Sequence, residues 1–244
     1  MKRYAVVDVF ATLQGEGFQV GVPAVFVRFV GCNMWSGYAE DRERDADRSG
    51  AKCPIFCDTY FARGEKLTIP ELYARMVAAA VARGMPRVPL VVFTGGEPLL
   101  QMDGDLLDRL RTLCDSSPLL KDSVFALETN GSVPLRDEVR MFLKWIAVSP
   151  KLPDKEIVVR TGAELRVVFP DYDPTQYVEL AFGFPHRYVS PRNPIGHEYR
   201  ADGEQLIHQR PALHSSNTEA AIAFCFANPR WKLSLQTHKV TGLP

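Results

Sequence analysis

The sequence predicts an α/β domain with a parallel sheet, and two observations lead to this fold class. Apolar strand-like segments alternate along the chain with segments of helical periodicity, which is the order expected when helices connect parallel strands. Several strand segments, such as Val88–Phe93, are nearly continuous apolar runs, and such runs suit strands that are covered on both faces. Periodicity alone leaves open whether such a sheet closes into a barrel.

Short apolar segments supply the candidate strands: Tyr4–Val9, Ala24–Val30, Val88–Phe93, Val124–Leu127, Trp145–Val148, Leu165–Phe169, Arg187–Val189 and Trp231–Leu235. Helical patterns lie between or after them: Thr68–Gly84, Asp103–Leu113, Arg136–Leu143 and Ser216–Ala227. Two of these helices open with a capping pattern, in which Thr68 precedes Glu71 and Ser216 precedes Glu219 by three residues.

Composition limits the class of protein. The 244 residues suit one domain, expected to span 1–244, and 46% hydrophobic with 24% charged residues permit a packed core. The net formal charge is zero, so neither nucleic acid nor an anionic membrane is indicated as the main partner. The start of the chain reads as a first strand, and no apolar stretch approaches the roughly 20 residues of a membrane helix. We therefore expect a cytoplasmic protein.

One segment does not fit the alternation. Residues 36–52 mix both signs of charge and contain almost no apolar side chain, so we expect an inserted surface loop that is solvated. This insertion separates the first cysteine of the chain, Cys32, from the next two.

The cysteines indicate metal ligation. Their odd number, without a secretion signal, argues against a disulfide framework, and Cys32, Cys53 and Cys57 lie close together in the sequence. Three thiolates can hold three irons of a 4Fe–4S cluster and leave the fourth iron open. A structural zinc site usually has four ligands, yet the first histidine is His186. Spacing alone leaves a cluster, a zinc site and three unrelated thiols open. The two remaining cysteines read as packing residues: Cys114 and Cys225.

A glycine-rich turn follows a strong strand at Thr94–Pro98, with the sequence TGGEP. Gly95 and Gly96 permit a close approach of the backbone to a ligand, and Glu97 can accept hydrogen bonds from an ammonium group. The alternative is a plain tight connection between a strand and a helix.

The three-cysteine loop after an early strand and the later TGGEP turn resemble the radical S-adenosylmethionine superfamily. Further segments narrow the resemblance, and they occur in this order: LQGEG at Leu13–Gly17, PAVFVRFVGCNMW at Pro23–Trp35, CDT at Cys57–Thr59, ETNG at Glu128–Gly131, VSPK at Val148–Lys151 and QTHK at Gln236–Lys239. As an ordered set, they resemble the 7-carboxy-7-deazaguanine synthase family from Leu13 to Pro244.

The resemblance implies a radical SAM core folded as an incomplete, partial TIM-type barrel of parallel strands with helical crossovers, in a homodimer. It implies a lyase of queuosine and 7-deazapurine biosynthesis that converts 6-carboxy-5,6,7,8-tetrahydropterin to 7-carboxy-7-deazaguanine and releases ammonia. The implied cofactors are a 4Fe–4S cluster, S-adenosylmethionine and Mg²⁺. A reduced cluster, supplied with electrons by flavodoxin or ferredoxin, would cleave S-adenosylmethionine to a 5′-deoxyadenosyl radical that takes hydrogen from C6 of the pterin.

Site residues carry over from the resemblance position by position. The cluster ligands are Cys32, Cys53 and Cys57, and Thr59 is the magnesium ligand. The expected S-adenosylmethionine contacts are Gly96, Glu97, Ser149, Pro150, Lys151, Ser190, Pro191, Arg192 and Asn193. The expected substrate contacts are Leu13, Gln14, Gly15, Arg28, Thr94 and Pro244, the last through its carboxylate, and Glu16 is a plausible polar partner.

The cysteine spacing departs from the common CxxxCxxC pattern, because twenty residues separate Cys32 from Cys53 and three separate Cys53 from Cys57. Ser36 stands where the second cysteine is usual, but thiolate is the better iron ligand. Two other functions stay open: another radical S-adenosylmethionine enzyme, such as one that activates a glycyl-radical protein, and a non-catalytic zinc-binding domain.

Overall fold

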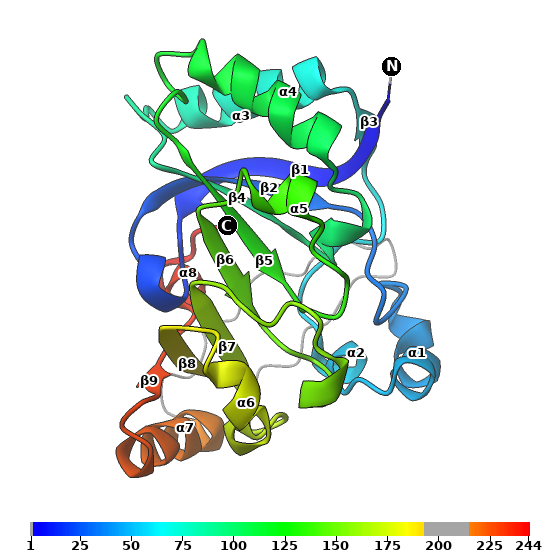
Figure 1. Cartoon of the computed structure of the whole chain (residues 1–244), viewed down its shortest axis with the longest axis vertical. Coiled ribbons are helices and arrows are strands. Elements are labelled where there is room, and N and C mark those ends of the chain that lie inside the picture. The colour runs from blue at the N-terminus through cyan, green and yellow to red at the C-terminus, as the bar shows by residue number, and fades with distance from the viewer. Residues whose placement is uncertain (1, 193–214) are drawn as a thin grey trace.

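The computed structural model describes residues 2–192 and 215–244. Its centre is one sheet of nine strands in the order β3-β1-β2-β4-β5-β6-β7-β8-β9, curled as Figure 1 shows. Neighbours from β2 to β9 pair in parallel, and β3 and β9 form the two edges. The strands are β1 (Tyr4–Leu13), β2 (Pro23–Phe29), β3 (Glu65–Leu67), β4 (Leu90–Gly95), β5 (Val124–Thr129), β6 (Trp145–Val148), β7 (Glu164–Phe169), β8 (His186–Pro191) and β9 (Lys232–Leu233).

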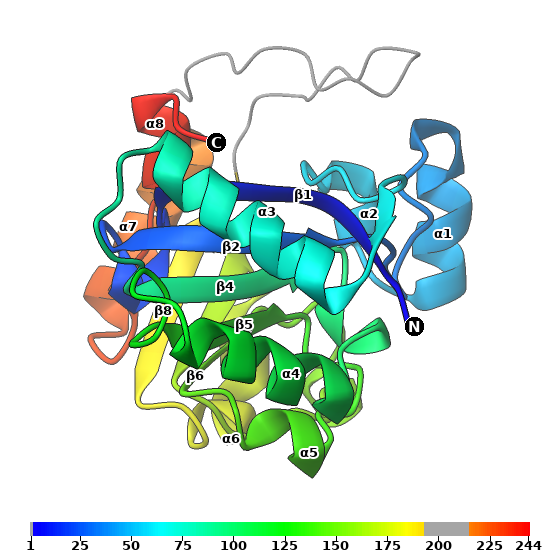
Figure 2. The same cartoon turned by 90° about the horizontal axis from the view of Figure 1, so that it is seen from above.

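Helices cover the outer face of this sheet, and Figure 2 shows α3 and α4 running side by side across it. The α-helices are α1 (Arg42–Ser49), α2 (Cys53–Phe56), α3 (Ile69–Ala82), α4 (Gly104–Asp115), α5 (Asp137–Arg140), α6 (Val178–Ala181), α7 (Ser216–Ala227) and α8 (Thr237–Thr241). Short 3₁₀ turns are η1 (Gly17–Gln19), η2 (Ala39–Asp41), η3 (Pro98–Leu100), η4 (Asp154–Glu156) and η5 (Pro174–Tyr177). The predicted α/β fold with an incomplete barrel is therefore confirmed.

The two capping predictions differ in outcome. Thr68 and Glu71 form the predicted capping box at the start of α3. At α7 the cap lies one residue earlier than predicted, because the side chain of Ser215, not Ser216, accepts the N–H of Thr218.

The nearly continuous apolar runs are explained by two apolar clusters on opposite faces of the sheet. Val25 and Val27 of β2 belong to the large core under the helices, whereas Ala24 and Phe26 belong to a smaller cluster on the inner face. Alternate residues of one strand thus enter different clusters, as the side-chain period of two requires. No helix in the described ranges is both long enough and apolar enough to cross a membrane.

The first strands depart from the expected all-parallel sheet. β1 pairs antiparallel with both β2 and β3. Only residues 14–22 connect β1 to β2, and a parallel crossover needs a dozen or more residues, so this short connection forces a hairpin. β3 has three residues, too few for a periodic pattern, and the sequence did not predict it.

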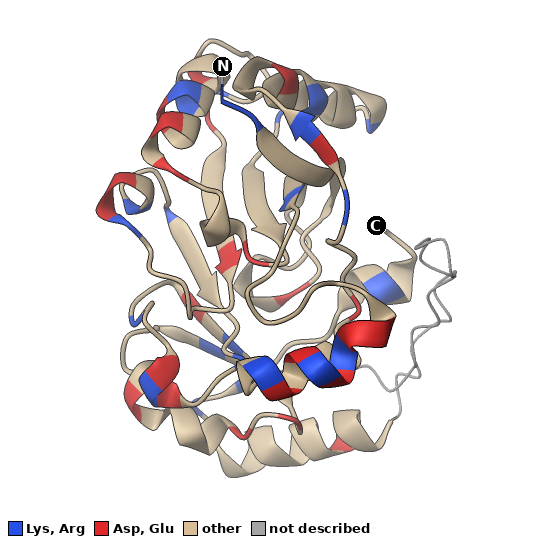
Figure 3. Ribbon diagram, turned by 90° about the vertical axis from the view of Figure 1, so that its right-hand side faces the viewer, with Lys and Arg blue, Asp and Glu red and all other residues tan. Residues whose placement is uncertain are grey.

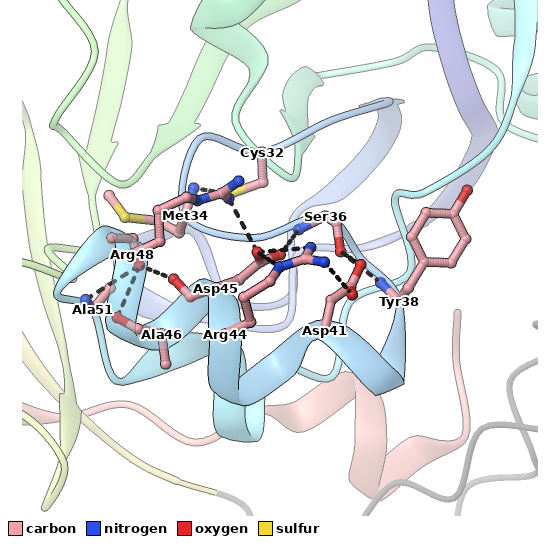
Figure 4. A network of polar contacts seen from close by, with 11 residues as sticks. Cys32, Met34, Ser36, Tyr38, Asp41, Arg44, Asp45, Ala46, Arg48 and Ala51 are labelled. Carbon is pink, nitrogen blue, oxygen red and sulfur yellow. Dashed lines mark hydrogen bonds and ion pairs between the residues drawn. The ribbon is translucent and has the colours of Figure 1, made fainter.

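The insertion at 36–52 is solvated along most of its length, as predicted, but the prediction of a loop is wrong, because the segment is folded. It contains η2 and α1, and the Asp45 side chain is fully buried. Figure 4 shows why: the carboxylate accepts the Ser36 N–H at 2.6 Å and is bracketed by Arg44 at 3.0 Å and Arg48 at 3.4 Å. Figure 3 shows charges of both signs interspersed along α1. The segment therefore lacks the apolar face from which a helix is usually predicted.

Replacing Asp45 with asparagine is expected to destabilise this insertion. Burial raises the pKa of the Asp45 carboxyl, but the Ser36 N–H and the Arg44 side chain outweigh it and hold that pKa below its usual range. The stabilisation is therefore present above the pKa of the unfolded chain and is lost as the pH falls through the folded-state pKa. We expect the variant to lose about 1–3 kcal/mol of local stability at neutral pH.

Hydrogen exchange of the amides in residues 36–52 measures this loss. The matched control is Asp47→Asn on the exposed side of the same helix, for which we expect unchanged exchange. Equal exchange in both variants at neutral pH would show that the Asp45 contacts do not hold the insertion.

Candidate active site

Two neighbouring cavities lie against the inner face of the sheet, where the parallel strands end. The first, here the cysteine cavity, is lined by Cys32, Cys53 and Cys57 together with the end of β4. The second, here the Arg28 cavity, is lined by Arg28, the Leu13–Glu16 segment and the C-terminal residues. The two cavities share four lining residues: Glu16, Thr59, Thr94 and Glu128. Groups bound in the two cavities would therefore be neighbours, because both would contact these four shared residues.

Local geometry brings the three cysteines together. Cys32 follows β2, Cys53 is the first residue of α2, and Cys57 caps that helix, with its N–H donating to the Cys53 carbonyl at 2.8 Å. A spacing of four positions on a helical turn places both side chains on one face, which accounts for the three residues between them. Ser36 does not line this cavity in the described chain, and its hydroxyl donates to Asp41 at 2.9 Å instead.

The donor set of the cysteine cavity fits an iron–sulfur cluster. Within the described residues, no three His, Cys, Asp or Glu side chains lie close enough to hold a single metal ion. The ligands of a cubane bind different irons and so lie farther apart than the ligands of one ion. Three thiols spread around one cavity are therefore compatible with a cluster of several irons.

Burial dominates the chemistry of these thiols. It raises the pKa of Cys32 to about 11 and that of Cys53 to about 12, although the charge of Lys151 and a hydrogen bond from Tyr172 partly oppose the second shift. Such thiols carry their protons at neutral pH and lose them only when a metal replaces the proton.

The glycine turn after β4 forms a wall of the same cavity. Gly95 has a φ of 148°, and a Cβ on Gly96 would lie 2.3 Å from the Gly31 carbonyl oxygen and 2.8 Å from Cys32 Cβ. Only glycine fits at position 96, so the backbone itself borders the space beside Cys32.

Strand alternation sets the inner wall of the Arg28 cavity. Arg28 on β2 and Thr94 on β4 are register partners, and Glu128 on β5 follows on the same face of the sheet. The Arg28 guanidinium lies 5.2 Å from the Phe10 ring, and its Nε is buried without a hydrogen-bond partner. An unpartnered buried donor beside a cavity suits an anionic ligand.

The comparisons with known proteins agree with this geometry. No family model matches the chain. A 7-carboxy-7-deazaguanine synthase from Nitratidesulfovibrio vulgaris is 39% identical over 251 residues, which cover 99% of each chain. The chain belongs to the 7-carboxy-7-deazaguanine synthase family. Relatives with the same name from Bordetella pertussis and Caulobacter vibrioides are 39% and 38% identical, again over 99% of each chain.

The fold agrees as well. The solved structure of QueE from Escherichia coli superposes with a TM-score of 0.57 at 23% identity, over 96% of this chain and 94% of that one. The 7-carboxy-7-deazaguanine synthase family is a radical S-adenosylmethionine family that uses a 4Fe–4S cluster.

The expected S-adenosylmethionine contacts separate into two groups. Gly96, Ser149 and Lys151 line the cysteine cavity, and Lys151 Nζ donates to the Ser149 carbonyl at 2.8 Å. Pro150 is buried between the last two and does not line the cavity.

Glu97 lies elsewhere than expected. Its side chain is fully buried behind the cavity wall, where it accepts the Thr129 hydroxyl and the Asn130 N–H at 2.9 and 2.8 Å. Burial raises the pKa of Glu97 to about 7. This carboxyl group is already occupied, so it positions the ETNG segment instead of meeting a ligand ammonium.

Ser190, Pro191 and Arg192 also do not line the cavity in the described chain. Arg192 donates to Asp171 at 2.6 Å and lies over the ring of Phe56 in α2. The remaining expected contact, Asn193, lies outside the described residues.

All expected substrate contacts line the Arg28 cavity: Leu13, Gln14, Gly15, Arg28, Thr94 and Pro244. The expected magnesium ligand Thr59 lines both cavities. A Cβ on Gly15 would lie 2.0 Å from Nδ1 of His238, so a side chain at this position would displace the imidazole from its place beside the cavity.

A buried charge cluster between the cavities was not predicted from the sequence. Arg166 on β7, only 6% exposed, contacts Glu16 at 2.5 Å, Glu128 at 2.7 Å and Glu164 at 2.9 Å. The Glu164 contact is an ion pair without hydrogen-bond alignment. Although burial disfavours its charge, these glutamates raise the pKa of Arg166 above its ordinary value. The sequence offered one sign of this cluster, because Arg166 is the single charged residue in the otherwise apolar predicted strand Leu165–Phe169.

The QTHK segment supplies further residues that had no predicted role. Gln236, His238 and Lys239 line the Arg28 cavity, and the buried Lys239 pairs with Asp58, the neighbour of Thr59. Burial lowers the pKa of His238, so the imidazole is neutral at physiological pH. QTHK is the last of the ordered family motifs in the sequence, and this alone could have indicated that its side chains belong to the site.

Proposed function

We propose that this chain is a 7-carboxy-7-deazaguanine synthase, which converts 6-carboxy-5,6,7,8-tetrahydropterin to 7-carboxy-7-deazaguanine and releases ammonia. One observation carries the proposal: the cysteine cavity and the Arg28 cavity share Thr94 and Glu128 as a common wall. A radical made in the first cavity would then form next to a substrate held in the second. Family membership supports the same reaction.

In the cysteine cavity, Cys32, Cys53 and Cys57 would hold the cluster. When bound, the cluster supplies the electron that cleaves S-adenosylmethionine to a 5′-deoxyadenosyl radical. The glycine turn at Gly96 allows the cofactor to approach the backbone, and the half-buried Lys151 side chain lines the same cavity as the three cysteines.

In the Arg28 cavity, each polar group has a plausible task. Arg28 presents a planar fork that matches the pterin carboxylate. Gln14 donates to Glu128 at 3.2 Å, and its amide oxygen accepts the Glu16 N–H at 3.2 Å. Both side chains are therefore held in place beside the cavity, where the nitrogen-rich edge of the ring would bind. Thr59 and Asp58 offer hard oxygen ligands for Mg²⁺, which prefers oxygen and retains waters.

The charge cluster around Arg166 lies where the two cavities meet. It keeps Glu16 and Glu128 in fixed orientations, since both carboxylates bond to one rigid guanidinium. Burial raises the pKa of Glu128, but the positive charge of Arg166 opposes this effect, and the net pKa lies below its usual range. Glu128 is therefore ionised, so it accepts hydrogen bonds and does not donate them.

We also propose that the protein acts in the cytoplasm as a homodimer and receives electrons from a small redox protein such as flavodoxin or ferredoxin. These partners rest on the family resemblance. Size-exclusion chromatography with light scattering, and turnover supported by each electron donor, test them.

One experiment tests the function. The protein is purified anaerobically, reconstituted with iron and sulfide, and incubated with reductant, S-adenosylmethionine and 6-carboxytetrahydropterin. We expect a brown protein and formation of 7-carboxy-7-deazaguanine, detected by mass spectrometry. A glycyl-radical activating enzyme would cleave S-adenosylmethionine without forming this product, and a zinc-binding domain would stay colourless.

Replacing Arg28 with lysine is expected to impair substrate binding more than cluster chemistry. Lysine keeps the positive charge but loses the bidentate fork, so kcat/KM for the pterin should fall about 10- to 100-fold, mainly through KM. Steady-state kinetics measure this, and the electron paramagnetic resonance spectrum of the cluster should not change. An unchanged KM would remove Arg28 from the substrate site.

A further inference from the structure

The hydroxyl of Tyr172 accepts two backbone hydrogen bonds at the start of α2. It receives the N–H of Lys52 at 3.0 Å and the N–H of Cys53 at 2.9 Å, across 119 or more residues of sequence. Tyr172 is buried, and its own N–H donates to the Val168 carbonyl at 3.0 Å. Tyr172, which follows β7, therefore holds the backbone of Cys53, the residue directly after the insertion.

Helix α2 lacks a cap of its own. The first N–H groups of any helix have no partner within the helix, and the N-cap residue Lys52 makes no side-chain cap hydrogen bond. The tyrosine hydroxyl takes the place of that cap. A phenol oxygen can accept two hydrogen bonds and donate one, so the hydroxyl proton remains available to an acceptor such as the sulfur of Cys53.

Neighbouring contacts hold the same helical turn. The Tyr172 and Phe56 rings meet edge to face at 6.3 Å, and Lys52 Nζ donates to the Asp171 carbonyl at 3.0 Å. At the other end, Arg42 of the insertion donates to the carbonyls of Pro54 and Cys57. Of these side chains, Tyr172 is the one whose hydroxyl accepts the backbone N–H of Cys53.

We propose that Tyr172 is a positioning residue for the cluster, which holds Cys53 in place across the 20-residue separation from Cys32 and donates a hydrogen bond to its sulfur. This inference rests on the proposed function, because it needs a cluster bound by Cys53. Hydrogen bonds to cluster sulfurs stabilise the reduced, more negative state and so raise the reduction potential. Loss of the hydroxyl should therefore lower the potential and loosen the Cys53 ligand.

The test compares Tyr172→Phe with Tyr4→Phe in the reconstituted full chain. Tyr4 is also buried and loses one hydroxyl hydrogen bond, to Asp103 at 2.9 Å, in a different part of the fold. For Tyr172→Phe we expect iron release to a chelator to be about tenfold faster, as the loss of a hydrogen bond to a charged group predicts. We also expect a more negative midpoint potential and an altered electron paramagnetic resonance spectrum, with Tyr4→Phe unchanged in all three.

Hydrogen exchange in the cluster-free protein keeps the inference testable if Tyr172→Phe binds no cluster. The amides of Lys52 and Cys53 should then exchange faster in Tyr172→Phe than in Tyr4→Phe. A potential, spectrum and iron-release rate equal to those of the parent would overturn the inference while leaving the proposed function intact. A parent protein that holds no cluster would instead overturn the proposed function.

Discussion

Cys53→Ala should abolish turnover and prevent assembly of a complete 4Fe–4S cluster. The variant lacks one of the three thiolates that line the cysteine cavity, and a buried alanine offers no ligand in its place. Iron and sulfide analysis, together with electron paramagnetic resonance of the reduced protein, measures the loss. Cleavage of S-adenosylmethionine should fall below detection.

The control for this variant is Cys225→Ala, which removes a thiol on α7 that lines neither cavity. We expect full iron content and parental turnover. Ser36 is the alternative ligand raised by the sequence, and its hydroxyl is already bonded to Asp41. A Cys53→Ala protein with a complete cluster would therefore show that Cys53 is not the third ligand.

Arg166→Gln should be among the most destabilising single changes in this protein. It leaves the carboxylates of Glu16, Glu128 and Glu164 close together without their common cation. Removing one partner of a buried ion pair costs about 3–5 kcal/mol, and like charges add to that cost. Urea unfolding of the cluster-free protein measures the loss, and we expect turnover to fall with it.

The pH dependence identifies the cause of this loss. In the parent protein Arg166 holds the pKa of Glu128 below its ordinary value, so this group stabilises the fold above its unfolded-state pKa and ceases to do so as the pH falls. In Arg166→Gln the attraction of the guanidinium is lost, and burial is opposed mainly by the hydrogen bonds from Thr94 and Gln14. We therefore expect the pKa of Glu128 to rise, so that protonation relieves the repulsion. The difference in stability between the two proteins should shrink as the pH is lowered from 7 to 5.

A matched control is Arg87→Gln, which removes an ion pair with Asp122 at 2.8 Å where both side chains are more than half exposed. We expect a change within about 0.5 kcal/mol, since exposed ion pairs contribute little. If Arg166→Gln were as stable as Arg87→Gln at pH 7, the buried cluster would not act as a coupled unit.

The sequence by itself determined the class of fold and the order of most elements. Apolar runs such as Leu90–Phe93 and the capping box at Thr68 are local features, so their physical basis lies within a few residues. It also predicted Cys32, Cys57 and Gly96 as site residues, and all three line the cysteine cavity. A cysteine motif and a glycine turn are recognisable from their neighbours along the chain.

Only the tertiary structure decided which distant residues complete the site. Arg166 meets Glu16 across 150 residues of sequence, and Tyr172 meets Cys53 across 119. The structure also shows Asp45 buried in a segment that the sequence predicts to be a solvated loop. Glu97, predicted as a ligand contact, is buried behind the wall of the cavity. The curl of the sheet and the return of long loops to it decide which distant residues meet. A buried charge needs a partner, and that partner can lie so far away in the sequence that no local pattern identifies it.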